Sequence, residues 1–148
     1  MQRFRFRLTG LLRLRSQMER ASRRALAVAM GNVVAVEQRI AAATESLQQC
    51  EDHGRGIGAA AQLARSLEQG LSRYQWRLQR ELRAAEAQLD RARTDWTERR
   101  RDEQALQKLR ETAKAQWRAA SLRHEQHELE ELARLRAGAP ATVREVKS

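Results

Sequence analysis

The sequence predicts an all-α protein, a long antiparallel two-helix coiled-coil hairpin with an overhanging C-terminal helix. Apolar residues recur in alternating steps of four and three from residue 78 to residue 96, which is the 3.5-residue period of a coiled-coil seam. A second run with the same period precedes it, from residue 29 to residue 50. Ala, Arg, Leu, Gln and Glu dominate the composition, and the chain has one proline, Pro140. An isolated helix would leave its narrow apolar stripe exposed to water, so we expect the two helices to pack together through their stripes.

The first helix is expected over about residues 8–52. Its seam positions are Ala29, Val33, Val36, Ile40, Ala43, Leu47 and Cys50. Residues 3–8 alternate basic and apolar side chains as a strand would, but no second strand is available to pair with them, so a helical or frayed start is expected. Because Cys50 lies on the seam, it is expected to be a small buried apolar residue. A single cysteine excludes an internal disulfide and suits a reducing cytoplasm.

The second helix follows a glycine-rich break. A turn with a short helix is expected over residues 53–70, because Gly54, Gly56 and Gly58 interrupt the helical pattern and Gly70 reads as a second joint. The second helix is then expected over about residues 71–137, with seam positions Leu78, Leu82, Ala85, Leu89, Ala92 and Trp96. We therefore predict one hairpin domain over residues 1–137 and a disordered tail over residues 138–148.

The facing pairs follow from folding the two seams onto each other. Pairs whose residue numbers add up to 125 place Leu47 opposite Leu78 and Val36 opposite Leu89, so that smaller residues mostly meet larger ones. The same register gives unfavourable pairs toward the chain termini, where Arg15 would face Arg110. A shift by one heptad stays open. In this register the second helix projects alone beyond Trp117 for about 20 residues, or ~30 Å at 1.5 Å per residue.

Charge and composition limit the function classes. The chain of 148 residues carries a net charge of +10, and its first 50 residues contain nine basic and three acidic side chains. Arg3, Arg5 and Arg7 lie in that segment and offer a docking surface for an acidic partner. The acids interleaved with Arg99–Arg101 favour a solvated face there. No apolar run approaches the ~20 residues of a membrane span, so none is expected.

No constellation in the sequence supports catalysis. His124 and His127 are three residues apart, whereas the zinc-protease motif requires four. The glycines at 54–58 follow no strand, so they do not form a dinucleotide fingerprint. We therefore expect no enzymatic activity, no metal site and no cofactor.

Two other features suggest protein contacts. Beyond Trp117 the apolar stripe changes phase to Leu122, Leu129 and Leu132, which leaves an amphipathic tip free for another protein. Trp76 is out of phase with the seam and lies among arginines. Both interpretations of Trp76 stay open, packing against residues 59–69 or an exposed contact surface.

These features together resemble the flagellar export protein FliJ family. The likeness is carried by the opening Phe4-Arg5-Phe6-Arg7-Leu8, the glycine break, the basic segment from Asp95 to Leu109, and Gln126-His127-Glu128-Leu129-Glu130-Glu131-Leu132-Ala133. It spans residues 1 to about 137. In the last motif Glu130-Glu131 stands where Asp-Glu is usual.

The resemblance implies a non-enzymatic stalk and adaptor of the bacterial flagellar type III export apparatus, placed in the cytoplasm at the inner membrane face of the flagellar basal body. It implies that the end with both termini enters the ring of the export ATPase FliI, and that one face binds the export gate protein FlhA, with export chaperones as further partners. The ATPase surface would comprise Arg3, Arg5, Arg7, Leu122, Leu129 and Leu132, and the gate surface Leu67, Leu71, Tyr74 and Leu78. The equivalent stalk of an injectisome is the nearest rival, and a basic coiled coil that binds nucleic acid or an acidic membrane surface is the alternative function.

Overall fold

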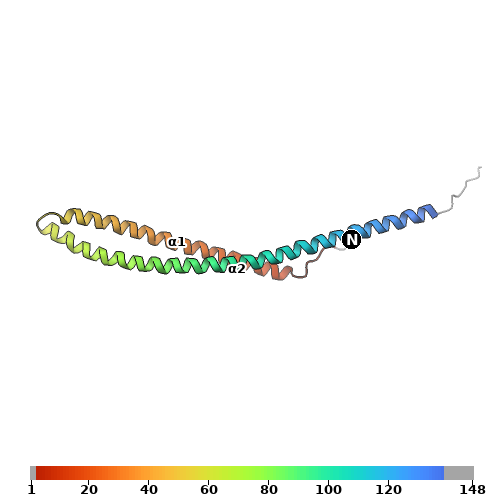
Figure 1. The fold of residues 1–148 in the computed structure, drawn as a ribbon, viewed down its shortest axis with the longest axis horizontal. Helices are drawn as coiled ribbons and strands as arrows, with labels where there is room; N and C mark the ends of the chain where they lie inside the picture. Colours follow the sequence, from red (N-terminus) through yellow and green to blue (C-terminus); the bar gives the residue numbers. More distant parts are fainter. Residues whose placement is uncertain (1–2, 139–148) are drawn as a thin grey trace, which may run out of the picture.

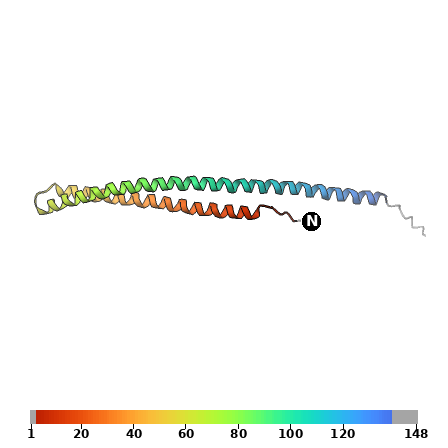
Figure 2. The same cartoon turned by 90° about the horizontal axis from the view of Figure 1, so that it is seen from below.

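The computed structural model describes residues 3–138, which form a two-helix hairpin (Figure 1). Helix α1 spans Thr9–Gly54, with 46 residues, and helix α2 spans Ala59–Gly138, with 80 residues. The two helices run side by side from the turn to the start of α1, and α2 then continues alone (Figure 2). The predicted all-α antiparallel hairpin with an overhanging C-terminal helix is confirmed. The predicted tail falls almost wholly outside the described residues.

The turn is shorter than the sequence suggests. Only residues 55–58 connect the helices, and Gly58 closes the turn with a φ of +117°, in the left-handed region that favours glycine. Arg65 on α2 donates a hydrogen bond from Nη1 to the carbonyl oxygen of Gly54 at 3.1 Å. The separate short helix expected over residues 53–70 is not observed, because α2 begins at Ala59 and passes through Gly70 without a break. A helical glycine costs about 1 kcal/mol, which packing of the surrounding seam residues offsets.

The predicted seams are confirmed and extend in both directions. Every predicted seam residue is buried or half-buried, and Leu78 is the most buried large side chain, at 1% exposed. On α1 the 3–4 spacing continues outward through Leu26, Ser22 and Glu19 to Leu12. On α2 it runs back through Leu71 to Ala61 and forward to Leu106. The seam near the turn is mostly apolar, with Glu68 and Gln75 as half-buried exceptions, whereas its terminal half includes more polar and charged side chains.

The predicted register is wrong by one heptad. Six contacts between side chains of the two helices fix the observed register. They are Arg15 with Asp102, Ser16 with Glu103, Arg39 with Glu81, Gln75 with Thr44, Glu19 with Trp96, and Met18 with Arg99. The residue numbers in these pairs add up to between 115 and 120 and average about 118, which is seven less than the predicted 125. Ile40 therefore lies opposite Leu78 instead of Ala85.

Charge and burial in the terminal half explain the shift. In the predicted register Arg15 would face Arg110, a repulsive pair. In the observed register Arg15 Nη1 lies 2.7 Å from a carboxylate oxygen of Asp102. The same shift places Leu12 opposite Leu106, and both side chains are buried. Near the turn most facing pairs are apolar in either register, so the charged pairs of the terminal half decide between them.

Helix α1 carries more exposed apolar surface than the sequence analysis expects. It is the one helix among the described residues that is long and apolar enough to cross a membrane by length and composition, which corrects the expectation that no such stretch exists. The cause is a run without charged side chains over residues 25–36. Val28, Met30 and Val34 in this run are about half or more exposed. Core helices of soluble proteins meet the same test, so this finding assigns no membrane span.

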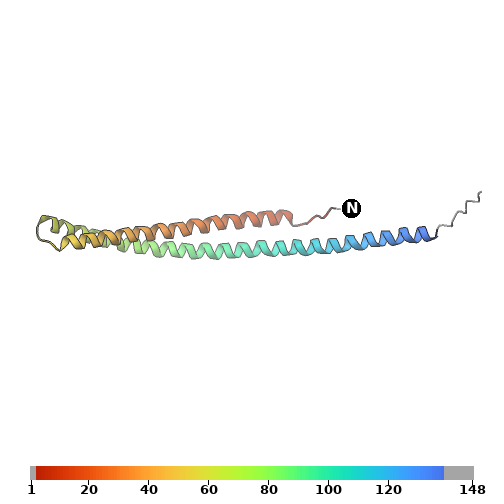
Figure 3. The ribbon, with the colours of Figure 1, turned by 90° about the horizontal axis from the view of Figure 1, so that it is seen from above.

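The overhang of α2 is longer than predicted. Residues 3–8 are not helical, and α1 begins at Thr9, whose backbone N–H and hydroxyl both donate to the carbonyl oxygen of Phe6. In the observed register Thr9 lies near residue 109 of α2. Residues 110–138 of α2 therefore have no helix beside them (Figure 3), a length of about 44 Å at 1.5 Å per residue.

Candidate functional site

A buried polar cluster joins the two helices in the terminal half of the hairpin. The carboxylate of Glu19, which is 2% exposed, accepts a hydrogen bond from Trp96 Nε1 at 2.9 Å and another from Arg23 Nη2 at 2.7 Å. Arg100 stacks over the Trp96 ring, with its Cζ 5.1 Å from the ring centre. The Trp96 hydrogen bond, together with Arg23, lowers the pKa of Glu19 even though burial acts to raise it. The cluster holds Glu19 as a charged seam residue.

Glu19 is a seam residue that was not predicted from the sequence. The signal was present in the spacing, because Glu19 lies three residues before Ser22 and seven before Leu26. In a sequence, a charged side chain at a seam position indicates an interruption of the seam. The structure shows that the Trp96 indole donates a hydrogen bond to this buried carboxylate.

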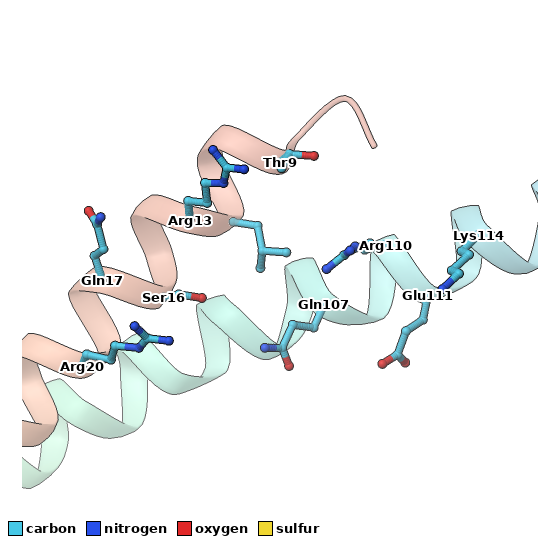
Figure 4. A pocket seen from close by; sticks show the side chains of 10 residues that line it. Thr9, Arg13, Ser16, Gln17, Arg20, Gln107, Arg110, Glu111 and Lys114 are labelled. Carbon is cyan, nitrogen blue, oxygen red and sulfur yellow. The ribbon is translucent and has the colours of Figure 1, made fainter. Parts of the chain in front are cut away.

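A basic groove lies between the start of α1 and α2 (Figure 4). Its cavity of about 710 Å³ is lined by Thr9, Leu12, Arg13, Ser16, Gln17, Arg20, Gln107, Arg110, Glu111 and Lys114. Four of these side chains are basic and one is acidic. Within residues 3–138 none of the four basic side chains forms an ion pair. In Figure 4 Arg110 extends from α2 toward α1, so the groove presents uncompensated positive charge to solvent.

The non-helical N-terminal segment packs on α2 through its aromatic residues. Phe4 and Phe6 are half-buried, and the ring of Phe4 lies 6.0 Å from that of Trp117 between centroids, with the planes tilted by 53°. The intervening residues Arg3, Arg5 and Arg7 are exposed. The strand-like alternation in the sequence therefore separates residues that anchor the segment from arginines that face solvent.

The predicted stripe on the overhang is fully accessible. Leu122, Leu129 and Leu132 are 59%, 65% and 57% exposed. Leu122 follows Trp117 by five residues, which is about 140° around a helix of 3.6 residues per turn. Since Trp117 marks the side that faces the N-terminal segment, Leu122 and Leu129, the latter at about 120°, point in a different direction. The stripe does not continue the seam with α1, and it is free for another partner.

The histidines on the overhang form ordinary helical pairs. His124 Nδ1 lies 3.3 Å from Glu128, and His127 Nδ1 lies 3.4 Å from Glu131, each pair four residues apart. No group of side chains able to hold a metal ion occurs in the part of the chain that the structure describes. The structure thus gives these histidines exposed carboxylate partners on one helix face.

Only part of the gate surface named in the sequence analysis is accessible. Leu67 is 52% exposed and Tyr74 is 36% exposed, whereas Leu71 is half-buried and Leu78 is buried in the seam. Leu71 and Leu78 therefore support this surface from within the hairpin. Leu63, at 63% exposed, lies one turn before Leu67 on the same face.

Comparison with known proteins gives one match. The family model described as flagellar FliJ protein matches residues 4–141 of the chain. A search of curated proteins and a search of solved structures find no match.

Proposed function

The chain belongs to the flagellar FliJ family, and from that premise we propose that this flagellar export component is the stalk and adaptor that links the export ATPase to the export gate. The match covers nearly all described residues, which supports a role for the whole hairpin. The proposed role is mechanical and needs no catalytic group. It places the protein in the cytoplasm, at the membrane-facing side of the export complex. The family match does not favour the alternative of a nucleic-acid or membrane-surface binder.

One observation carries the proposed contact with the export ATPase FliI, namely the free leucine stripe on the overhang. Leu122, Leu129 and Leu132 are accessible, and Leu122 and Leu129 lie about 140° and about 120° around α2 from Trp117, which the N-terminal segment covers. A ring-shaped partner can surround a single overhanging helix without separating α1 from α2. Such a contact buries a few leucines at a time, which permits modest affinity and turning.

The basic groove and the exposed N-terminal arginines lie at the same end of the rod as the leucine stripe, and they support this end as the contact for the ATPase. Arg3, Arg5 and Arg7 lie beside the overhang, because Phe4 anchors their segment on Trp117. Uncompensated positive charge at the root of the overhang steers acidic surfaces and fixes orientation more than it adds affinity. The leucine stripe would then supply the contact and the arginines its direction.

The turn end of the rod is the proposed contact for the gate protein FlhA. Leu63, Leu67 and Tyr74 form an accessible row on α2, spaced by four and seven residues. The rod separates this row from the overhang by most of its length (Figure 2). One protein could therefore contact two partners at once.

The test compares two triple variants in stimulation of ATP hydrolysis by the purified export ATPase. Leu122→Ser, Leu129→Ser and Leu132→Ser together should abolish stimulation, while helicity is unchanged because all three side chains are exposed. The matched control replaces Val28, Met30 and Val34 with Ser, since these are also exposed and apolar but lie outside both surfaces. Full stimulation by the overhang variant would show that the stripe is not the docking element.

A further inference from the structure

Trp76 is exposed on the outer side of α2, near the turn. It is 59% exposed, and helix geometry places it about 200° around α2 from the buried Leu78, so it points away from α1. Residues 59–69 do not cover it, because they belong to the same helix and run away from it. Of the two interpretations that the sequence leaves open, the structure supports the exposed contact surface.

Four arginines surround Trp76. Arg73, Arg80 and Arg83 are three residues before, four after and seven after it, and all three share its face of the helix. The Arg80 guanidinium carbon lies 5.1 Å from the centre of the indole ring, a cation–π contact. A shallow, open hollow beside the ring is lined by Ser72, Arg73, Trp76 and Arg77.

The positive charge of this patch is not neutralised within the hairpin. None of Arg73, Arg77, Arg80 and Arg83 forms an ion pair with any residue between 3 and 138. The one acid between residues 73 and 83 is Glu81, and its carboxylate pairs with Arg39 of α1. The arginines are therefore free to pair with carboxylates brought by a partner.

We propose that the outer face of α2 from Arg73 to Arg83 binds an acidic segment of another protein, which places an apolar side chain against Trp76. Tryptophan and arginine are the residues that most often dominate binding energy at protein interfaces. Guanidinium groups match carboxylates in planar two-hydrogen-bond geometry, and the indole offers a large rigid apolar surface. The combination selects a segment that has both acidic residues and an apolar one.

The extent of the patch favours a short protein segment over nucleic acid. Ten residues of helix span about 15 Å, and the helix presents acids directly after the patch, at Glu86 and Asp90. A duplex that followed the rod would meet these acids. The patch also lies about 160° around α2 from Tyr74, so its partner and the gate protein need not compete. The inference does not rest on the proposed function.

The experiment measures a coupling between Trp76 and the apolar residue of a probe. The probe is a fluorescein-labelled peptide of glutamates with one central leucine, and a second probe has serine in place of that leucine. Fluorescence anisotropy is recorded with the full chain, with Trp76→Ala and with Arg80→Glu. Matched controls are Leu109→Ala, which removes another exposed apolar side chain of α2, and Lys108→Glu, which reverses another exposed charge.

The wild-type protein should bind the leucine peptide more tightly than the serine peptide. Trp76→Ala should weaken the leucine peptide on the order of tenfold and should bind the two peptides equally. Arg80→Glu should weaken both peptides, and the two controls should weaken neither. Equal affinities of wild type and Trp76→Ala for the leucine peptide, or no binding by wild type, would overturn the proposal. Tighter binding of a labelled DNA duplex, unaffected by Trp76→Ala, would show a general polyanion surface instead.

Discussion

Glu19 on α1 accepts a hydrogen bond from the indole of Trp96 on α2 at 2.9 Å, across the interface between the two helices. The carboxylate is 2% exposed, so the bond is made away from water. An apolar seam tolerates a shift by one heptad, because one aliphatic layer resembles another. A buried carboxylate with one indole partner does not, since any shift leaves the charge without its donor. The Glu19–Trp96 pair therefore specifies the register of the hairpin.

The first prediction is that losing the indole donor destabilises the hairpin. Trp96→Phe keeps an aromatic ring but leaves the Glu19 carboxylate with Arg23 alone. We expect a loss of about 1–3 kcal/mol in the free energy of unfolding, measured by urea titration with circular dichroism. The control is Trp117→Phe, because the contact of Trp117 with Phe4 is a ring contact that phenylalanine can keep. Equal stability of the two variants would mean that the Glu19–Trp96 bond adds nothing.

The second prediction concerns pH. The pKa of Glu19 lies below its ordinary value of 4.5 in the folded protein, chiefly because of the Trp96 hydrogen bond. A depressed folded-state pKa stabilises the fold above the unfolded-state pKa, and this contribution is lost as the pH falls through the folded-state value. The stability of the wild type should therefore fall toward that of Glu19→Gln as the pH is lowered below 4.5. Parallel pH profiles of the two proteins would contradict this assignment.

The sequence determined the architecture well but the register poorly, and the residues show why. Seam residues such as Val36 and Leu78 are identified by period alone, and period also indicates the overhang. Register near the turn is weakly specified, because most seam residues there are apolar in both registers. The contacts that decide it, Arg15–Asp102 and Glu19–Trp96, join polar side chains whose pairing is set in three dimensions.

The candidate binding surfaces could likewise be predicted where helical periodicity determines which side chains are exposed, and not elsewhere. Exposure of Leu122 and Leu129 was predictable, since the stripe changes phase relative to the seam. The division of the gate surface into exposed Tyr74 and buried Leu78 was not, because a residue at a seam position reads equally as interface or as support. The sequence could not decide the exposure of Trp76, because this depends on the short turn that makes residues 59–69 part of the same continuous helix.

The third prediction tests the register by disulfide formation. In a Cys50→Ser background, Ile40→Cys with Leu78→Cys should cross-link on mild oxidation, because these positions face each other in the observed register. Ile40→Cys with Ala85→Cys should not, because seven residues displace the second thiol by about 10 Å along the helix. Gel mobility without reductant reads out both pairs. The opposite outcome would restore the register with sums of 125.

The last prediction concerns the gate surface near the turn. Tyr74 is partly exposed, and Arg77 lies over its ring at 5.8 Å from the centroid, so Tyr74→Ala removes surface without opening the seam. We expect this variant to weaken binding to the purified gate protein several-fold while its unfolding free energy changes by no more than about 0.5 kcal/mol. Leu67→Ala should behave in the same way.

Leu78→Ala provides the contrast, because this side chain is 1% exposed and fills the seam. Leu78→Ala should lower the free energy of unfolding by about 2–5 kcal/mol. It should weaken gate binding only under conditions in which the turn end of the hairpin unfolds. Binding is measured at a temperature where each variant is fully helical by circular dichroism. If Tyr74→Ala and Leu67→Ala bind the gate protein as tightly as the wild type under these conditions, the residues that contact the gate lie elsewhere on the rod.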